Sequence, residues 1–289
     1  MASGEKNKTE GSTLYLVATP IGNLTDISER AKKVLSEVDF IAAEDTRNTA
    51  KLLGCYGIRG ELVSYHEHNR RESGERIVAR LLSGESCAVV TDAGMPAISD
   101  PGEDLVRLAA EAGIEVRIVP GACAAVSALA LSALSTQRFA FEGFLSAKAS
   151  ERRARLEAVA HDDRTLIFYE APHKLKSTLA DMAEIFGTER KISLSRELTK
   201  LNEQTMRTTL GEAARYYTEN EPRGEYVLVL EGGDGVYGAS QKEHLTVLTP
   251  EEHVAHYEAE GMARMAAIKA AARDRGMTKS ELYKLLIGE

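Results

Sequence analysis

The chain is poor in cysteine, has no long apolar run and carries no overall excess of positive charge, and each absence excludes a class of protein. Cys55, Cys87 and Cys123 are too few and too scattered for a disulfide framework or a Cys-x-x-Cys metal site. Each lies beside apolar or small residues, so we expect three buried core thiols. No apolar run approaches the roughly 20 residues of a membrane span, and residues 1–11 lack the apolar core of a signal peptide. We therefore expect a cytoplasmic protein with no membrane partner.

The charge is acidic overall but reverses in one segment. The formal net charge of −8 argues against a protein coated in basic charge for non-specific binding to nucleic acid. Residues 262–287, by contrast, carry six basic and two acidic side chains, a local balance of +4. Such charge usually marks a solvated helix face. Its sign, opposite to that of the whole chain, also favours a contact with nucleic acid.

Apolar segments alternate with helical patterns, which predicts an α/β fold. The first series predicts a mainly parallel sheet covered by helices, with strands at 14–18, 40–43, 88–90 and 116–119 and helices at 28–37, 46–53, 75–82 and 104–112. A helical run of small residues at 122–134 leads to a second series, with strands at 139–144, 166–169, 192–194 and 226–230 and helices at 151–160 and 175–186. Two α/β lobes are expected.

Composition also predicts the domain limits. We expect a flexible tail at 1–12, an N-terminal α/β lobe at 13–124, a C-terminal α/β lobe at 125–237, a linker at 238–248 and a helical domain at 249–289. In the last of these, Thr249-Pro250-Glu251-Glu252 is typical of a helix start, and Thr278 with Glu281 forms a capping box.

Four turns rich in glycine, proline and alanine follow predicted strands, at 18–24, 92–102, 119–124 and 168–173. Open parallel sheets bind ligands at the carboxyl ends of their strands, and small residues let a ligand approach the backbone. One such turn is usually only a tight connection, but four favour a site. None matches Gly-x-Gly-x-x-Gly or Gly-x-x-x-x-Gly-Lys-Ser/Thr, so neither a dinucleotide nor a triphosphate is indicated.

Three polar clusters accompany these turns: Glu44-Asp45-Thr46-Arg47, Tyr65-His66-Glu67-His68-Asn69 and Arg196-Glu197-Leu198-Thr199-Lys200. The two histidines lack the spacing of a helical His-Glu-x-x-His site, so no metal is expected. Their side chains suit hydrogen bonds to a polar substrate equally well. The last cluster is also typical of a salt bridge at a surface helix.

Taken in order, these loops resemble those of the tetrapyrrole methylase superfamily, in particular its members that methylate ribosomal RNA. The resemblance covers nearly the whole ordered chain and departs from the pattern at Met95, Lys174 and Asn202. It implies a two-lobed tetrapyrrole methylase-like fold with a cofactor cleft between the lobes, plus a small C-terminal helical domain. It also implies S-adenosyl-L-methionine as cofactor, 2′-O-methylation of a cytidine in the decoding region of 16S rRNA, the small ribosomal subunit as partner, and a homodimer.

The same resemblance assigns roles to residues. It implies a cofactor site formed by Pro20, Gly22, Asp92, Ala93, Gly94, Ile98, Ser99, Gly121, Ala122, Cys123, Tyr169 and Leu198. Substrate contacts are expected from Arg47, His66, His68, Asn69, Lys269, Arg273 and Lys279.

Methyl transfer from a sulfonium is an in-line displacement that needs no metal, but a group must accept the proton of the ribose hydroxyl. The candidates are Asp100, Glu170, Glu197 and Lys200, and the sequence does not choose among them. Two alternatives are C-methylation of a tetrapyrrole precursor within the same superfamily and non-catalytic binding of ribosomal RNA. The basic C-terminal segment and the loop at 65–69 argue against the first.

Overall fold

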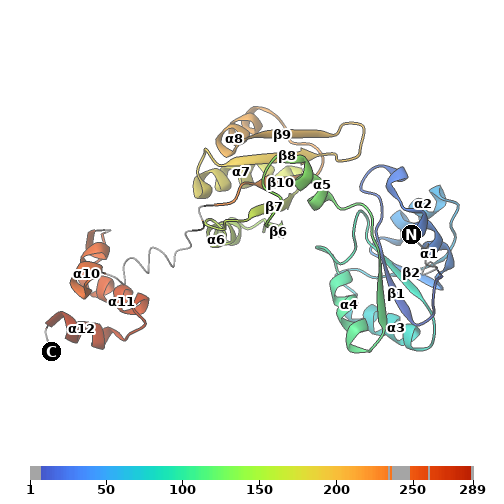
Figure 1. The fold of residues 1–289 in the computed structure, drawn as a ribbon, viewed down its shortest axis with the longest axis horizontal. Coiled ribbons are helices and arrows are strands. Elements are labelled where there is room, and N and C mark those ends of the chain that lie inside the picture. Colours follow the sequence, from blue (N-terminus) through green and yellow to red (C-terminus); the bar gives the residue numbers. More distant parts are fainter. Residues whose placement is uncertain (1–7, 234, 236–247, 260, 288–289) are drawn as a thin grey trace. The chain divides into compact units, whose positions relative to one another are not determined.

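The computed structural model describes residues 8–233, 235, 248–259 and 261–287, drawn as a ribbon in Figure 1. They form two compact units: one contains the described residues up to Arg152 together with Thr165–Glu231, and the other contains Arg153–Arg164 and the described residues from Gly232 onward. Apart from Leu248, the predicted linker at 238–248 lies outside the described residues, as do the first seven residues of the predicted tail. Within the described part, no helix is long and apolar enough to cross a membrane.

The first lobe is a five-stranded parallel sheet with strand order β3-β2-β4-β1-β5. The strands are β1 (Thr13–Val17), β2 (Phe40–Ala43), β3 (Glu61–Ser64), β4 (Cys87–Val90) and β5 (Glu115–Val119). A short 3-10 turn, η1 (Leu24–Asp26), and the helices α1 (Glu29–Glu37), α2 (Thr46–Cys55), α3 (Arg70–Leu82) and α4 (Gly102–Glu111) connect them. The predicted parallel sheet is confirmed. β3 was not predicted, because it is short and begins at an exposed glutamate.

Alternating side chains of each strand enter cores on opposite faces of this sheet. Ile41 and Ala43 of β2 pack with Leu35 of α1, whereas Phe40 of the same strand packs with Leu81 of α3. Because both faces are covered by helices, the central strands β2 and β4 are buried along their whole length. The carboxyl ends of the strands therefore remain as the edge open to a ligand.

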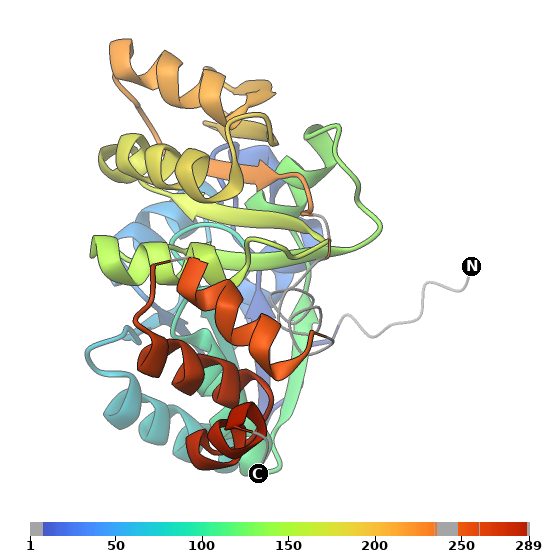
Figure 2. The ribbon, with the colours of Figure 1, turned by 90° about the vertical axis from the view of Figure 1, so that its left-hand side faces the viewer.

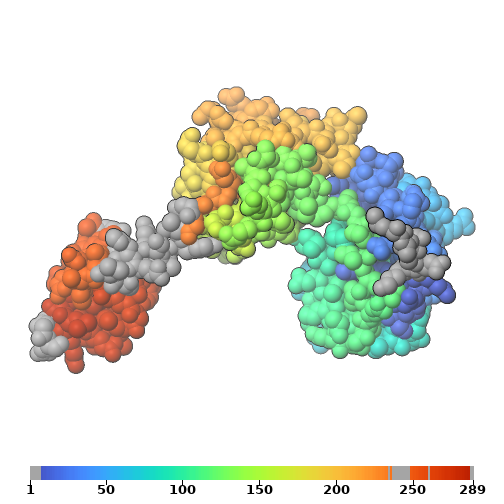
Figure 3. All heavy atoms as spheres, in the orientation of Figure 1, coloured from blue at the N-terminus to red at the C-terminus, as the bar shows by residue number. Residues whose placement is uncertain are grey.

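The second lobe is a mixed sheet with order β6-β7-β10-β8-β9, in which β6 and β7 are parallel and the remaining pairs are antiparallel. Its strands are β6 (Phe139–Phe144), β7 (Thr165–Glu170), β8 (Lys191–Arg196), β9 (Gln204–Thr209) and β10 (Tyr226–Leu230). Its helices are α5 (Ala124–Leu131), α7 (Pro172–Phe186) and α8 (Leu210–Glu219), and α6 (Ala149–Ala158) begins in the first unit and continues into the other. β9 and α8 were not predicted from the sequence. Figure 3 shows the surface of the first unit hollowed between its two lobes.

The described residues 248–259 and 261–287 form three helices, α10 (Pro250–Ala259), α11 (Arg264–Asp274) and α12 (Lys279–Ile287), which Figure 2 shows packed together. Their core consists of small and medium side chains, among them Ala267, Ala271 and Leu282. The predicted capping box is confirmed, because the backbone N–H of Thr278 donates to Glu281 at 2.7 Å and that of Glu281 donates back at 3.3 Å.

The cysteines occupy three different environments. Cys87 is buried in β4, and burial raises the pKa of its thiol to about 12. Cys123 is half-buried, and Cys55 is exposed. The prediction of three buried thiols is therefore wrong for Cys55. α2 buries Thr49 and Leu53, four residues apart on one face, and Cys55 lies about 200° around the helix from Leu53, on the outer face.

Candidate functional site

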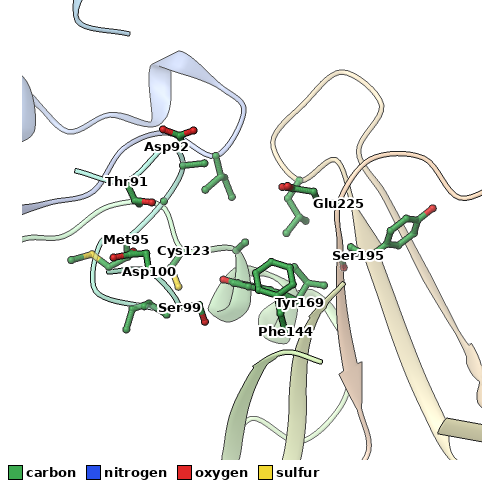
Figure 4. A pocket seen from close by; sticks show the side chains of 18 of the residues that line it. Thr91, Asp92, Met95, Ser99, Asp100, Cys123, Phe144, Tyr169, Ser195 and Glu225 are labelled. Carbon is green, nitrogen blue, oxygen red and sulfur yellow. The ribbon is translucent and has the colours of Figure 1, made fainter. Parts of the chain in front are cut away.

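A pocket of about 360 Å³ lies where the two lobes of the first unit meet (Figure 4). In the first lobe, loops after the adjacent strands β1, β2 and β4 reach it, because parallel strands end at one edge of the sheet. In the second lobe, antiparallel pairing places the start of β10 beside the ends of β7 and β8, with Tyr226 opposite both Glu170 and Arg196. The volume falls in the range of about 300 to 1,000 Å³ typical of small-molecule sites.

Backbone shape defines one wall of the pocket. Gly94 has a φ of 89°, and its N–H and C=O bond to Thr19 at 3.1 and 2.9 Å, which ties the loop after β4 to the exit of β1. Ala97 and Ser99 also adopt positive φ values of 67° and 64°, which are uncommon for residues other than glycine. Strained backbone of this kind clusters at ligand clamps.

Asp100 holds this loop and also faces the pocket. Its Oδ1 accepts the backbone N–H groups of Ala97 at 3.0 Å and Gly102 at 2.7 Å. Its Oδ2 is buried and accepts no hydrogen bond from the described residues. Since buried polar atoms almost always have a partner, a hydrogen-bond donor on a ligand is the natural complement to this oxygen.

The pocket is rich in acids. Five carboxylates line it, against one basic side chain among the described lining residues, Lys200: the acids are Glu44, Asp92, Asp100, Glu197 and Glu225. Partial burial raises the pKa of Glu44, and the neighbouring carboxylate of Asp92 raises it further. The hydroxyl of Thr91 donates to Glu44 at 3.2 Å. A ligand that carries positive charge suits this surface.

Aromatic rings form the opposite wall. Phe144 and Tyr169 lie with ring centroids 5.4 Å apart, and the Tyr169 hydroxyl accepts the N–H of Ala125 at 3.1 Å. Burial raises the pKa of Tyr169 to about 12, so the phenol stays neutral and fixed. The side chain of Phe144 remains 53% exposed within the pocket. A planar ring can stack there.

Most of the residues predicted to hold a cofactor lie around this pocket. Those that line it are Asp92, Ala93, Gly94, Ile98, Ser99, Cys123, Tyr169 and Leu198. The other four, Pro20, Gly22, Gly121 and Ala122, do not line it. Gly22 lies against the loop of Lys200, since a Cβ there would meet Lys200 Cγ at 2.4 Å, and a Cβ at Gly121 would meet Ala18 Cβ at 2.8 Å.

The catalytic candidates divide into two groups. Asp100, Glu197 and Lys200 line the pocket, and the last two form an ion pair of 3.1 Å. Glu170 does not line it, because its side chain is fully buried and bonded to Thr178 at 2.5 Å and to Lys174 at 3.0 Å.

The predicted substrate residues lie outside this pocket. Arg47 pairs with Asp45 at 3.2 Å. The Asn69 amide accepts the N–H of His66 at 2.8 Å and donates to Ser64 O at 3.1 Å, so it stabilises the loop after β3 that also carries His68. Lys269, Arg273 and Lys279 line a separate hollow of about 490 Å³ among the C-terminal helices. Across the described residues, no cluster of His, Cys, Asp or Glu could hold a metal ion.

Sequence reasoning missed several lining residues. Glu44 belongs to a polar cluster noted in the sequence but was assigned no role there, although its place directly after β2, at the carboxyl edge, was a signal for one. Phe144 ends β6, which runs parallel to β7, so its place at a strand end was a similar signal. Ser195 and the residues at 225–227 carry no such signal, because antiparallel pairing of β8 and β10 brings them to the pocket.

This two-lobed α/β fold with a pocket at the strand ends is that of a tetrapyrrole methylase. The family model for Tetrapyrrole (Corrin/Porphyrin) Methylases matches residues 13–214. Among solved structures, uroporphyrin-III C-methyl transferase from Thermus thermophilus, complexed with S-adenyl homocysteine, is similar with a TM-score of 0.54 and 17% identity, over 76% of this chain and 97% of the other. That likeness concerns the fold.

Two curated relatives place the chain more narrowly. Ribosomal RNA small subunit methyltransferase I of Halalkalibacterium halodurans is 48% identical over 97% of this chain and 96% of its own length. The protein of that name in Bacillus subtilis is 47% identical over 96% and 94%. The chain therefore belongs to the tetrapyrrole methylase family and, within it, to the family of ribosomal RNA small subunit methyltransferase I.

Proposed function

We propose that this protein transfers a methyl group from S-adenosyl-L-methionine to the ribose 2′-oxygen of a cytidine in the decoding region of 16S rRNA. The acid-rich pocket with an aromatic wall is the observation that carries this proposal. The names of its relatives support ribosomal RNA of the small subunit as substrate. Methylation of a tetrapyrrole precursor has only the fold in its favour.

The residues around the pocket fit this cofactor. Carboxylates suit its positive sulfonium and ammonium groups, and Phe144 offers a face for adenine. Gly94 lets the ligand approach the backbone, and Cys123 and Leu198 add apolar contacts. When bound, the cofactor supplies a methyl group on positively charged sulfur, which an oxygen nucleophile displaces in line.

The chain must orient the ribose hydroxyl and take its proton. Lys200 and Glu197 are paired with each other at 3.1 Å, so each is already engaged by a side chain of opposite charge. Glu44 has a raised pKa, which makes it a stronger base than an ordinary carboxylate, and Asp100 presents an oxygen without a partner among the described residues. We assign proton acceptance to Glu44 and orientation of the ligand to Asp100.

The test removes one carboxylate at a time. Glu44→Gln should lower kcat for methylation of unmodified small subunits by about 100-fold to 10,000-fold, the usual contribution of a general base. Its affinity for S-adenosyl-L-methionine, measured by calorimetry, should stay within about threefold, since the other four carboxylates of the pocket remain to face the positive charge. Glu75→Gln removes an acid from the outer face of α3 and serves as the charge control. A Glu44→Gln enzyme with unchanged kcat would refute this role.

RNA binding and assembly complete the proposal. Lys269, Arg273 and Lys279 would contact phosphates, and Arg47 and the loop carrying His66, His68 and Asn69 would contact the RNA near the reacting nucleotide. A homodimer is supported by apolar side chains that stay exposed on the edge strands β5 and β6 and on α5: Ile118, Phe139 and Val126.

A further inference from the structure

A shallow groove of about 280 Å³ adjoins the pocket, between η1 and the exposed face of α2. We propose that this groove binds the RNA nucleotide next to the methylated one, an inference that rests on the function proposed above. No cofactor, substrate or catalytic assignment was made for the groove residues of η1 and α2. Its volume lies just below the range of about 300 to 1,000 Å³ typical of small-molecule sites, which suits one nucleotide of a polymer better than a second cofactor.

The groove and the pocket share a wall. Thr91 and Asp92 line both, and each is held by a residue from the loop or helix after β2. The Asn48 amide donates to Asp92 Oδ2 at 3.0 Å from the groove side, and the Thr91 hydroxyl donates to Glu44 at 3.2 Å. A ribose positioned at Glu44 would therefore have its polymer neighbour at the mouth of the groove.

The groove lining offers one group for each part of a nucleotide. Lys51 is exposed, and no ion pair joins it to another side chain in the described ranges, so its ammonium is available to a phosphate. Leu24 is 46% exposed, and its carbonyl accepts the Tyr56 hydroxyl at 2.7 Å, which fixes an apolar surface against which a base can pack. The remaining N–H of Asn48 can meet a base edge.

The three cysteines differ in their exposure to solvent, which allows a direct test on the full chain. Cys55 lines the groove, Cys123 lines the pocket and Cys87 is buried. Alkylation by N-ethylmaleimide, followed residue by residue with mass spectrometry, should be slowed at least about tenfold at Cys55 by unmethylated small subunits. S-adenosylhomocysteine should slow Cys123 and leave Cys55 unchanged. Lys33→Cys adds a reference thiol on the exposed surface of α1, which reports general shielding by the particle.

Each other outcome overturns the inference. Equal protection of Cys55 and of the thiol introduced by Lys33→Cys would mean that the particle shields without occupying the groove. Protection of Cys55 by S-adenosylhomocysteine would assign the groove to the cofactor. Protection that grows with protein concentration alone would assign it to a second copy. Methylation of the same subunits is assayed in parallel, so loss of the proposed activity is seen separately.

Kinetics give a second measurement. Lys51→Ala should raise KM for the RNA several-fold at unchanged kcat and cofactor affinity, and should flatten the salt slope of binding by about 0.7, the value for one phosphate contact on a single strand. Lys33→Ala removes a lysine from the neighbouring helix α1 as the matched control. Identical KM and salt slope in the two variants would contradict the proposal.

Discussion

Replacement of Gly94 by aspartate tests whether the cofactor lies against the loop after β4. A Cβ at this position would stand 3.3 Å from Ile21 Cγ2 and 3.6 Å from Ala122 O, so the carboxylate beyond it must enter the pocket. An unpaired, desolvated charge costs several kcal/mol. Since about 1.4 kcal/mol corresponds to tenfold in affinity, S-adenosyl-L-methionine should bind well over tenfold more weakly.

The substitution also strains the backbone, and Gly113 provides the control for that cost. Both glycines have positive φ, 89° and 72°, but a Cβ at Gly113 meets nothing within 4 Å. Each aspartate should therefore destabilise the fold by about 1 to 2 kcal/mol through its left-handed backbone. Calorimetry should show weak cofactor binding only in Gly94→Asp, whereas Gly94→Asp and Gly113→Asp should lower Tm by similar amounts. Full affinity in a folded Gly94→Asp variant would refute the placement.

Three further outcomes follow from the site, the charge and the apolar surface. Asp92 raises the pKa of Glu44, so Asp92→Asn should move the acid limb of the profile of kcat/KM against pH to lower pH. An acid limb that stays at the same pH or moves to higher pH would contradict the assignment of Glu44 as the base. Joint replacement of Lys269, Arg273 and Lys279 by alanine should weaken RNA binding and flatten the dependence of log affinity on log salt concentration, without loss of helicity, because alanine is the best helix former. An unchanged salt dependence would mean that these charges only form a solvated helix face. Sedimentation at low micromolar concentration should show a dimer, and a monomer there would exclude the expected assembly.

The first lobe was predictable because its elements are local and its strands are parallel. Apolar runs such as β2 and β4 are buried on both faces, and every loop that follows them ends at one edge. The loop from Asp92 to Asp100 was therefore expected at a ligand site from its glycine, its proline and its position after a strand.

The second lobe was less predictable for a physical reason. Antiparallel pairing brings strand starts and strand ends together, so Glu225 and Ser195 line the same pocket although no motif joins them. β9 is a polar edge strand whose side chains are at most half-buried, which leaves little apolar alternation to detect. The sequence also does not reveal whether a carboxylate is buried, which is why Glu170 was grouped with the catalytic candidates.

Glu170 and Lys174 form a buried ion pair of 3.0 Å, with 0% and 16% of their side chains exposed, and its role is open to a stability test. The Glu170 carboxylate also accepts the Ala171 N–H at 2.9 Å, and the Lys174 ammonium donates to Leu145 O at 2.9 Å. Removal of the lysine would leave a buried negative charge without its partner, which typically costs about 3 to 5 kcal/mol. Lys174→Met should therefore lower Tm strongly, while Lys176→Met, which breaks an exposed pair two residues away, should cost about 0 to 1 kcal/mol. If Glu170 is structural, as its burial indicates, Lys174→Met assayed well below its Tm should retain cofactor affinity and kcat. A Lys174→Met variant with normal Tm but lost kcat would instead indicate that Glu170 takes part in catalysis.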